Sequence, residues 1–256
     1  MPAAWLQEQS CKEVEDYLAS DNRVLIPVGS TEQHGNFAPI GTDTYVAASL
    51  AESASAKTGV LIAPPLWYGW SPHHMVRPGT ISIRAEILLE VLFDVIKSLS
   101  DNGFKQFVVI NGHRMVNLAW IQIAAERAQR ELGVKVVLFD PAYMCKEIAK
   151  QLEFGPIGHA DEIEISHMLF NHPDLVNMEL ARDNPHPFRK LQHIDPTDHR
   201  DTLGYVPVTR EDLEHIFENT GDTIIGNPSQ ASPEKGRVYH EHLVGRLVEV
   251  LQQLSS

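Results

Sequence analysis

VLIPVGSTEQHG, residues 24–35, joins a strand-sized apolar run directly to a glutamate and a histidine. The stretch FVVINGH, residues 107–113, has the same order and ends in His113. Buried strands of an open α/β sheet usually carry their chemistry at their carboxyl ends. We therefore expect the ends of two neighbouring strands to bring Glu32, His34 and His113 together.

Strand-like and helix-like patterns alternate along the chain. Short apolar runs predict strands, and apolar residues at helical spacing predict helices, two of which end at Gly103 and Gly133. The predicted strands are 23–28, 60–63, 106–110 and 134–139, and the predicted helices are 6–21, 43–56, 84–102, 117–132, 160–170 and 238–254. This alternation is typical of an α/β fold with parallel βαβ units and helices on both faces of the sheet.

Residues 184–220 are polar and rich in proline and histidine, which predicts an excursion over the surface. No internal repeat, low-complexity tract or linker divides the sequence, so residues 1–256 are expected to form a single domain. Two groups of histidines are expected to be ordinary loop or surface residues: His186, His193 and His199 in the excursion, and His167, His172, His215, His240 and His242 elsewhere.

The composition narrows the classes of partner. The 256 residues carry a formal net charge of −13, which repels nucleic acid and anionic lipid surfaces. The apolar runs are far shorter than the ~20 residues of a membrane helix, and the N-terminus lacks a signal pattern, so a cytoplasmic protein is expected. Because Cys11 and Cys145 are the only cysteines, a metal would be held by oxygen and imidazole nitrogen.

The residues at the two predicted strand ends suit a transition-metal site. Glu32 and His34 lie two residues apart, so on extended chain they point the same way. Asp43 follows at a predicted helix start, where a carboxylate alone is most often explained by the exposed N–H groups. A lone His113 would likewise be an ordinary loop histidine. Together, carboxylates and imidazoles favour Zn²⁺, Mn²⁺ or Fe²⁺ over Mg²⁺ or Ca²⁺.

Motifs spread over nearly the whole chain resemble those of creatininase-like amidohydrolases. They are Ser30–Gly35, Pro39–Asp43, Pro78–Ser82, Asn111–His113, His159–Ser166, Gly226–Pro228, Ala231 and Glu234–Gly236. The resemblance implies a three-layer α/β/α sandwich with a mainly parallel central sheet, commonly assembled as a homohexamer. It also implies two divalent metal ions per subunit, bridged by an aspartate, and a small-molecule substrate.

The resemblance assigns metal ligands by position. Glu32, Asp43 and His113 would hold one ion, while His34 and Asp43 would hold the other. Creatininases complete the second site with a glutamate two residues beyond the histidine that matches His113. Here that position is Met115, which is a poor ligand for a site rich in oxygen. By resemblance, Glu164 is the favoured replacement and Glu162 is the alternative.

The same resemblance suggests a proton carrier and a substrate-facing loop. His159 matches the family's catalytic acid/base, although a solvent-exposed histidine at a helix start is the simpler explanation of the residue alone. Residues 66–75 match an aromatic loop that contacts substrate, with Ser71 and His74 as the polar contacts. Trp67 and Trp70 would line the substrate site, or else pack against a neighbouring subunit.

The predicted function is hydrolysis of a small polar carbonyl compound, most simply a cyclic amide or formamide, by attack of a metal-bridging hydroxide. Creatinine itself is disfavoured, because residues 154–158 lack the tryptophan that creatininases place before the histidine matching His159. One alternative is hydrolytic ring opening of an oxidised inositol, a cyclic ketone. Others are a metal-free binding protein on the same scaffold and a single-metal isomerase or aldolase.

Overall fold

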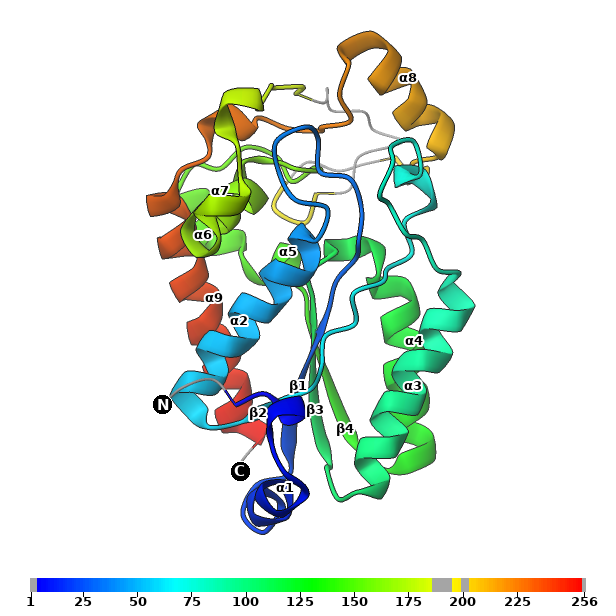
Figure 1. Cartoon of the computed structure of the whole chain (residues 1–256), viewed down its shortest axis with the longest axis vertical. Coiled ribbons are helices and arrows are strands. Elements are labelled where there is room, and N and C mark those ends of the chain that lie inside the picture. Colours follow the sequence, from blue (N-terminus) through cyan, green and yellow to red (C-terminus); the bar gives the residue numbers. More distant parts are fainter. Residues whose placement is uncertain (1–3, 186–194, 199–202, 255–256) are drawn as a thin grey trace.

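A four-stranded parallel sheet forms the centre of the computed structural model, which describes residues 4–185, 195–198 and 203–254. Its strand order is β2-β1-β3-β4, and the strands are β1 (Arg23–Val28), β2 (Leu61–Ile62), β3 (Gln106–Asn111) and β4 (Lys135–Phe139). Val28 pairs with Asn111, so β1 and β3 end at the same level. β1, β3 and β4 end at the upper edge of the sheet in Figure 1, whereas the short β2 pairs only with Val24 and Leu25 near the start of β1.

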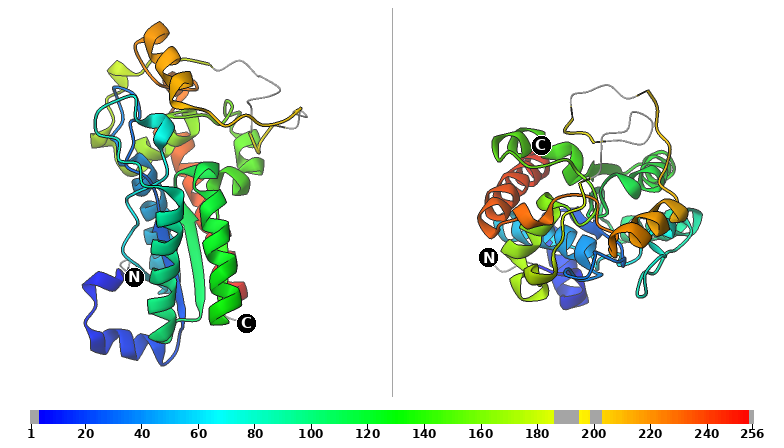
Figure 2. Two further views of the ribbon diagram at one scale, coloured as in Figure 1. Left: turned by 90° about the vertical axis from the view of Figure 1, so that its right-hand side faces the viewer. Right: turned by 90° about the horizontal axis from the view of Figure 1, so that it is seen from above.

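Helices cover both faces of this sheet (Figures 1 and 2). One apolar core lies between the sheet and α2 (Thr42–Thr58) and α9 (Pro233–Leu254), and a second lies between the sheet and α3 (Ala85–Asp101) and α4 (Leu118–Leu132). The other helices are α1 (Cys11–Leu18), α5 (Pro141–Met144), α6 (Lys146–Gln151), α7 (Glu162–Asn171) and α8 (Arg210–Thr220). This arrangement confirms the predicted three-layer α/β/α fold.

The terminal helix expected over 238–254 begins five residues earlier, at Pro233. Two other predicted segments differ from the structure because capping residues were overlooked. The helix expected over 6–21 is a short 3₁₀ turn followed by α1, which begins where Ser10 and Glu13 form a reciprocal capping box. The excursion expected over 184–220 contains α8, which begins at a second capping box between Thr209 and Asp212. The side chain of Leu213 in this helix is buried, so the excursion is not entirely a surface segment.

The prediction that His167 and His240 lie on the surface is wrong. Their side chains are 1% and 5% exposed, and His167 Nε2 lies 2.7 Å from His240 Nδ1. The two residues meet where α7 packs against α9, and a neighbouring imidazole supplies the polar partner that a buried histidine needs. The excursion histidines His186, His193 and His199 lie outside the described residues.

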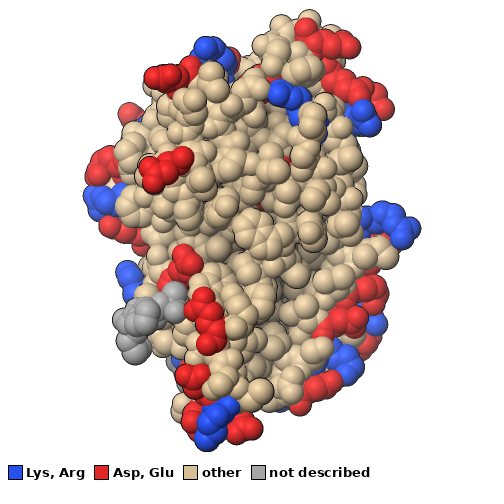
Figure 3. All heavy atoms as spheres, viewed as in Figure 1, with Lys and Arg blue, Asp and Glu red and all other residues tan. Residues whose placement is uncertain are grey.

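Charged side chains do not gather by sign on the face shown in Figure 3, where Lys and Arg are interspersed with Asp and Glu around a largely uncharged centre. Within the three described ranges, none of the helices has both the length and the apolar character that a bilayer span requires.

Candidate metal centre

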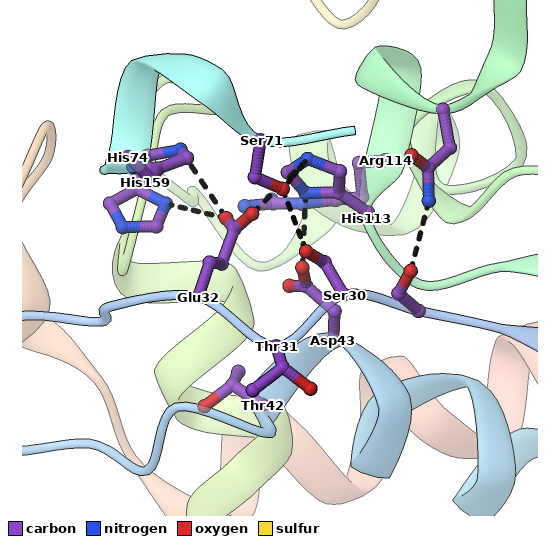
Figure 4. Close-up of polar contacts among 12 residues, drawn as sticks. Ser30, Thr31, Glu32, Thr42, Asp43, Ser71, His74, His113, Arg114 and His159 are labelled. Atoms are coloured by element: carbon purple, nitrogen blue, oxygen red, sulfur yellow. Dashed lines mark hydrogen bonds and ion pairs between the residues drawn. The ribbon is translucent and has the colours of Figure 1, made fainter. Parts of the chain in front are cut away.

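The predicted metal ligands converge beyond the carboxyl ends of β1 and β3. Figure 4 shows three of them, Glu32, Asp43 and His113, pointing toward one another. Glu32 and His34 lie in the loop after β1, Asp43 lies in the first turn of α2, and His113 follows β3. Glu164 reaches the same place from the first turn of α7. None of these five side chains is more than 6% exposed, so they form one buried cluster at the edge of the sheet.

Asp43 lies between two groups of potential ligands. Its Oδ2 is 3.0 Å from His113 Nδ1, and Glu32 Oε2 is 3.2 Å from His113 Nε2. Its Oδ1 is 3.3 Å from His34 Nε2, which is also 3.3 Å from Glu164 Oε2. Each carboxylate oxygen of Asp43 therefore faces a different group. Ligand atoms of Glu32, Asp43 and His113 lie within 4.8 Å of one another, as do those of His34, His159 and Glu164.

Two glycines allow this close approach. A Cβ on Gly112 would lie 1.9 Å from the Asp43 carbonyl oxygen, and one on Gly29 would lie 2.2 Å from Thr44 Oγ1. Real Cβ atoms do not come this close to other heavy atoms. The first turn of α2 therefore rests against the ends of β1 and β3 because both positions lack a side chain.

The hydrogen-bonding pattern of the cluster fits metal binding. Both carboxylate oxygens of Glu32, Asp43 Oδ2 and His34 Nε2 are buried without a hydrogen-bond partner among the described residues. Buried polar atoms are almost always paired, because leaving one unpaired costs about 1–3 kcal/mol. These atoms face one another across the cluster, and a divalent cation would satisfy them. The donors are carboxylate and imidazole, the set that Zn²⁺ and Mn²⁺ accept.

Burial and mutual charge shift the pKa values in the cluster. Burial raises the pKa of Glu32 to about 7. Burial alone would lower the pKa of His113, but Glu32 and Asp43 outweigh it and raise that pKa to about 9. Burial alone would raise the pKa of Asp43, but His113 and His34 outweigh it and lower that pKa. Without a metal near pH 7, the cluster thus holds an ionised Asp43 beside a protonated His113, while Glu32 is close to the midpoint of its titration.

Gln33 orients two further histidines. Its Oε1 accepts hydrogen bonds from Gly35 N (3.1 Å) and from Thr223 Oγ1, so its amide nitrogen is free to donate. That nitrogen donates to His74 Nδ1 (2.8 Å), which directs His74 Nε2 toward Glu32 Oε1 at 3.3 Å. His159 Nε2 lies 2.6 Å from the Gln33 carbonyl oxygen and 3.0 Å from Gln33 Nε2. Because the carbonyl oxygen can only accept and is the closer partner, we assign the proton to His159 Nε2. This network leaves His159 Nδ1 without a proton, 3.6 Å from Glu32 Oε1.

The cavity beside the cluster has a volume of about 490 Å³. Its wall includes the predicted residues Glu32, Asp43, Trp70, His74, His113, His159 and Glu164, and apolar residues that include Met115, Tyr143, Tyr205, Val208 and Leu213. Ser71 does not line it: this side chain is fully buried, and its Oγ lies 3.2 Å from His113 Nε2. Trp67 also lies outside the cavity, where its ring packs edge-on against Tyr45.

Sequence reasoning missed three polar residues of this site. Gln33 lies inside the quoted motif but was given no role, His73 lines the cavity beside His74, and Arg114 follows His113 directly. The adjacency of each to a predicted site residue was the available signal. Of the two candidates for the replacement carboxylate, Glu164 faces His34, whereas Glu162 pairs with the ammonium group of Lys235.

Asp140, at the end of β4, holds the turn that carries His113. Its Oδ2 accepts hydrogen bonds from Asn111 Nδ2 (2.9 Å) and Met115 N (2.8 Å), and Met115 has a positive φ of 34°. A non-glycine residue with a positive φ has a strained backbone, and this conformation persists only when the surrounding contacts hold it in place.

Asp140→Ala is therefore expected to lower the free energy of unfolding by about 2–4 kcal/mol, because it leaves buried donors unpaired and releases the strained turn. Asp140→Asn keeps one acceptor oxygen and is expected to cost less. Urea denaturation measures both variants. Equal stability of Asp140→Ala and the parent chain would show that this anchor is unimportant.

Comparison with known proteins agrees with this geometry. The family model for creatininase (creatinine amidohydrolase) matches residues 7–251. The chain is 30% identical to 3-dehydro-scyllo-inosose hydrolase of Thermotoga maritima, over 98% of this chain and 83% of the relative. It is 29% identical to creatinine amidohydrolase of Pseudomonas putida, over 72% and 77%.

Among solved structures, that of creatinine amidohydrolase (creatininase) superposes with a TM-score of 0.78 at 26% identity, covering 98% of this chain and 97% of the other. Other similar creatininase structures are described as Zn-Zn and Mn forms, at 24% and 26% identity. The match thus extends along almost the whole sequence and includes the fold on which the buried carboxylate and histidine cluster is built. The chain belongs to the creatininase family of hydrolases.

Proposed function

We propose that this protein is a hydrolase that uses two divalent metal ions, Zn²⁺, Mn²⁺ or Fe²⁺, to cleave a small polar compound at a carbonyl carbon. Glu32, Asp43 and His113 would hold one ion, and His34, Asp43 and Glu164 the other. The observation that carries the proposal is that the two oxygens of Asp43 face His113 and His34 separately, at 3.0 and 3.3 Å. Two such ions supply Lewis acidity, which polarises a carbonyl and acidifies water.

His159 would move the proton. Burial, reinforced by the nearby His34, lowers the pKa of His159 to about 3, so its ring is neutral near pH 7. The unprotonated Nδ1 faces the carboxylate cluster, where it can take up, only transiently because of this low pKa, the proton that an attacking water loses. The same nitrogen can then return the proton to the departing atom. Gln33 keeps the ring in this orientation through its carbonyl oxygen.

The cavity wall would position the substrate. His73, His74 and Trp70 lie on one side of it, and the apolar residues Tyr205 and Val208 lie on the chain that leads into α8. Polar groups near the cluster can bind hydroxyl or carbonyl groups of a small ring, while the apolar wall limits access of water. Because Ser71 is buried behind His113, we propose that it orients that imidazole and does not contact substrate.

Among substrates, an oxidised inositol or a similar cyclic polyol ketone is the first candidate. The similarity to the inosose hydrolase extends over 98% of this chain, compared with 72% for creatinine amidohydrolase. This order reverses the one expected from the motifs, in which a cyclic amide or formamide came first. The amide remains the second candidate because the family model is that of creatinine amidohydrolase.

Because the chain belongs to the creatininase family, we also propose that it is a cytoplasmic protein and that its single-domain subunits assemble as a homohexamer.

The mass of the product separates these functions. We expect metal-loaded protein to convert an oxidised inositol into an open-chain acid with the mass of one added water, and to leave creatinine unchanged. The measurement is mass spectrometry of reactions with an oxidised inositol, a set of lactams and a set of formamides. Consumption of only a lactam or formamide would favour the second candidate, and a product of unchanged mass would contradict hydrolysis.

A further inference from the structure

Arg114 is a buried cation next to the proposed metal centre. It follows His113 directly, its side chain is about nine-tenths buried, and it lines the cavity. Its Nη1 donates to Asp161 Oδ2 (2.9 Å), and its Nη2 lies 3.2 Å both from Glu164 Oε1 and from the Gly158 carbonyl oxygen. Arg114 therefore joins the segment that follows β3 to the segment that begins α7.

Asp161 extends this connection into the backbone of α7. Its Oδ1 accepts a hydrogen bond from Glu164 N (2.9 Å), which caps the helix, and its Oδ2 accepts another from Gly158 N (2.7 Å). The fork of Arg114 thus contacts both the cap of α7 and a side chain in its first turn. Guanidinium groups suit such a position because their donors are held in one rigid plane.

The two oxygens of Glu164 have different partners. Oε1 faces Arg114, whereas Oε2 accepts a hydrogen bond from Ala160 N (3.0 Å) and lies 3.3 Å from His34 Nε2. Arg114 thereby selects which oxygen of Glu164 faces the proposed metal cluster. We propose that Arg114 is a positioning residue that presents Glu164 Oε2 as a metal ligand and holds the start of α7 at that distance.

This inference rests on the proposed metal assignment and explains how the chain functions without a carboxylate at position 115. A ligand at that position would be carried by the same turn as His113, whereas Glu164 comes from a separate element, α7. A ligand from a separate element needs an anchor between the two elements. Arg114 provides that anchor, and its charge also balances part of the charge of Asp161 and Glu164.

The experiment is a titration of metal-free protein with Zn²⁺ in competition with a chromophoric chelator, for the parent chain and for Arg114→Gln. We expect the parent chain to bind about two equivalents. In Arg114→Gln one equivalent should bind roughly 10–100-fold more weakly, as is typical when a residue supporting a metal ligand is lost, while the other changes little. Arg127→Gln, which removes an arginine that pairs with Glu90 at the surface, is the matched control and should leave both affinities unchanged.

Two further variants show whether Arg114 positions Glu164 or only supports the fold. They are Arg114→Lys alone and Arg114→Lys combined with Glu164→Gln. Arg114→Gln leaves two buried carboxylates without their cation and can destabilise the protein, whereas Arg114→Lys keeps the charge but loses the fork. We expect Arg114→Lys to fold and still to weaken the same equivalent. In the Glu164→Gln background, where that equivalent is already weakened, Arg114→Lys should have no further effect.

The outcomes separate this inference from the function on which it rests. A parent chain that binds no metal would overturn both. A parent chain with two equivalents, together with Arg114→Lys of unchanged affinity, would overturn the positioning role alone. An equal further loss in the Glu164→Gln background would also overturn it, because Arg114 would then act on the fold and not through Glu164.

Discussion

Asp43→Asn is expected to reduce kcat/KM by about 1,000-fold or more and to lower metal content from about two equivalents to fewer than one. Asparagine has the same shape but lacks the charge, and Asp43 is the residue whose two oxygens face the two ligand groups. Losing one shared ligand therefore weakens both sites. A loss of about 4 kcal/mol of transition-state stabilisation corresponds to roughly this factor. Metal analysis after exhaustive purification and steady-state kinetics measure the two effects.

Glu32→Gln is the companion variant and should affect one ligand group more than the other, since Glu32 lies with His113 and not beside His34. Asp16→Asn, at an exposed position on α1, is the matched control and should behave like the parent chain. If Asp43→Asn keeps both equivalents of metal and full activity, the two-metal hydrolase is wrong. A parent chain that folds well but carries no metal would instead favour a metal-free binding protein.

Removal of metal with a chelator should abolish activity and lower the melting temperature by about 8–16 °C. Metal that is present at 1,000 times its Kd stabilises the folded state by about 4 kcal/mol, and each kcal/mol shifts the melting temperature of a chain of this size by about 2–4 °C. The structural reason is that Glu32 and Asp43 carry buried oxygens that lack hydrogen-bond partners among the described residues. Differential scanning calorimetry before and after dialysis against chelator measures the shift.

Re-addition of different ions provides the control for this experiment. Zn²⁺ or Mn²⁺ should restore both stability and activity, whereas Ca²⁺ should restore little, because two of the five proposed ligands, His34 and His113, are imidazoles. A chain whose melting temperature is the same with and without chelator would contradict the metal centre at Glu32, Asp43 and His113.

The sequence was sufficient to predict the sheet and most of the cluster. The runs before Gly29 and Asn111 are strand-sized and apolar, and parallel strands end at the same edge, so the convergence of Glu32, His34 and His113 follows from the pattern. The helix start after the loop explains Asp43 as a capping carboxylate, and only the resemblance to creatininase-like motifs predicted its role as a shared ligand. Helix boundaries were less accurate where short polar caps decide them, as at Ser10 and Thr209.

Contacts between distant segments could not be predicted from local pattern. The burial of His167 and His240 depends on how α7 packs against α9, and nothing within either helix indicates that packing. The choice between Glu164 and Glu162 depends on the rotation of α7, which a two-residue difference in sequence does not fix. Arg114 was missed for the same reason, because its partner Asp161 lies on another element. The contact of Ser71 with His113 likewise joins two elements that are distant in sequence.

At Gly29 and Gly112 the absence of a side chain shapes the proposed metal centre. Neither residue has a side chain that could bind a metal, yet each allows the first turn of α2 to lie against a strand end. A methyl group at either position would act as a spacer and push the Asp43 carboxylate out of line with its histidine partners. A search for improved variants can randomise the residues around the proposed metal centre. Such a search should keep Gly29 and Gly112 unchanged, as strictly as the proposed ligands.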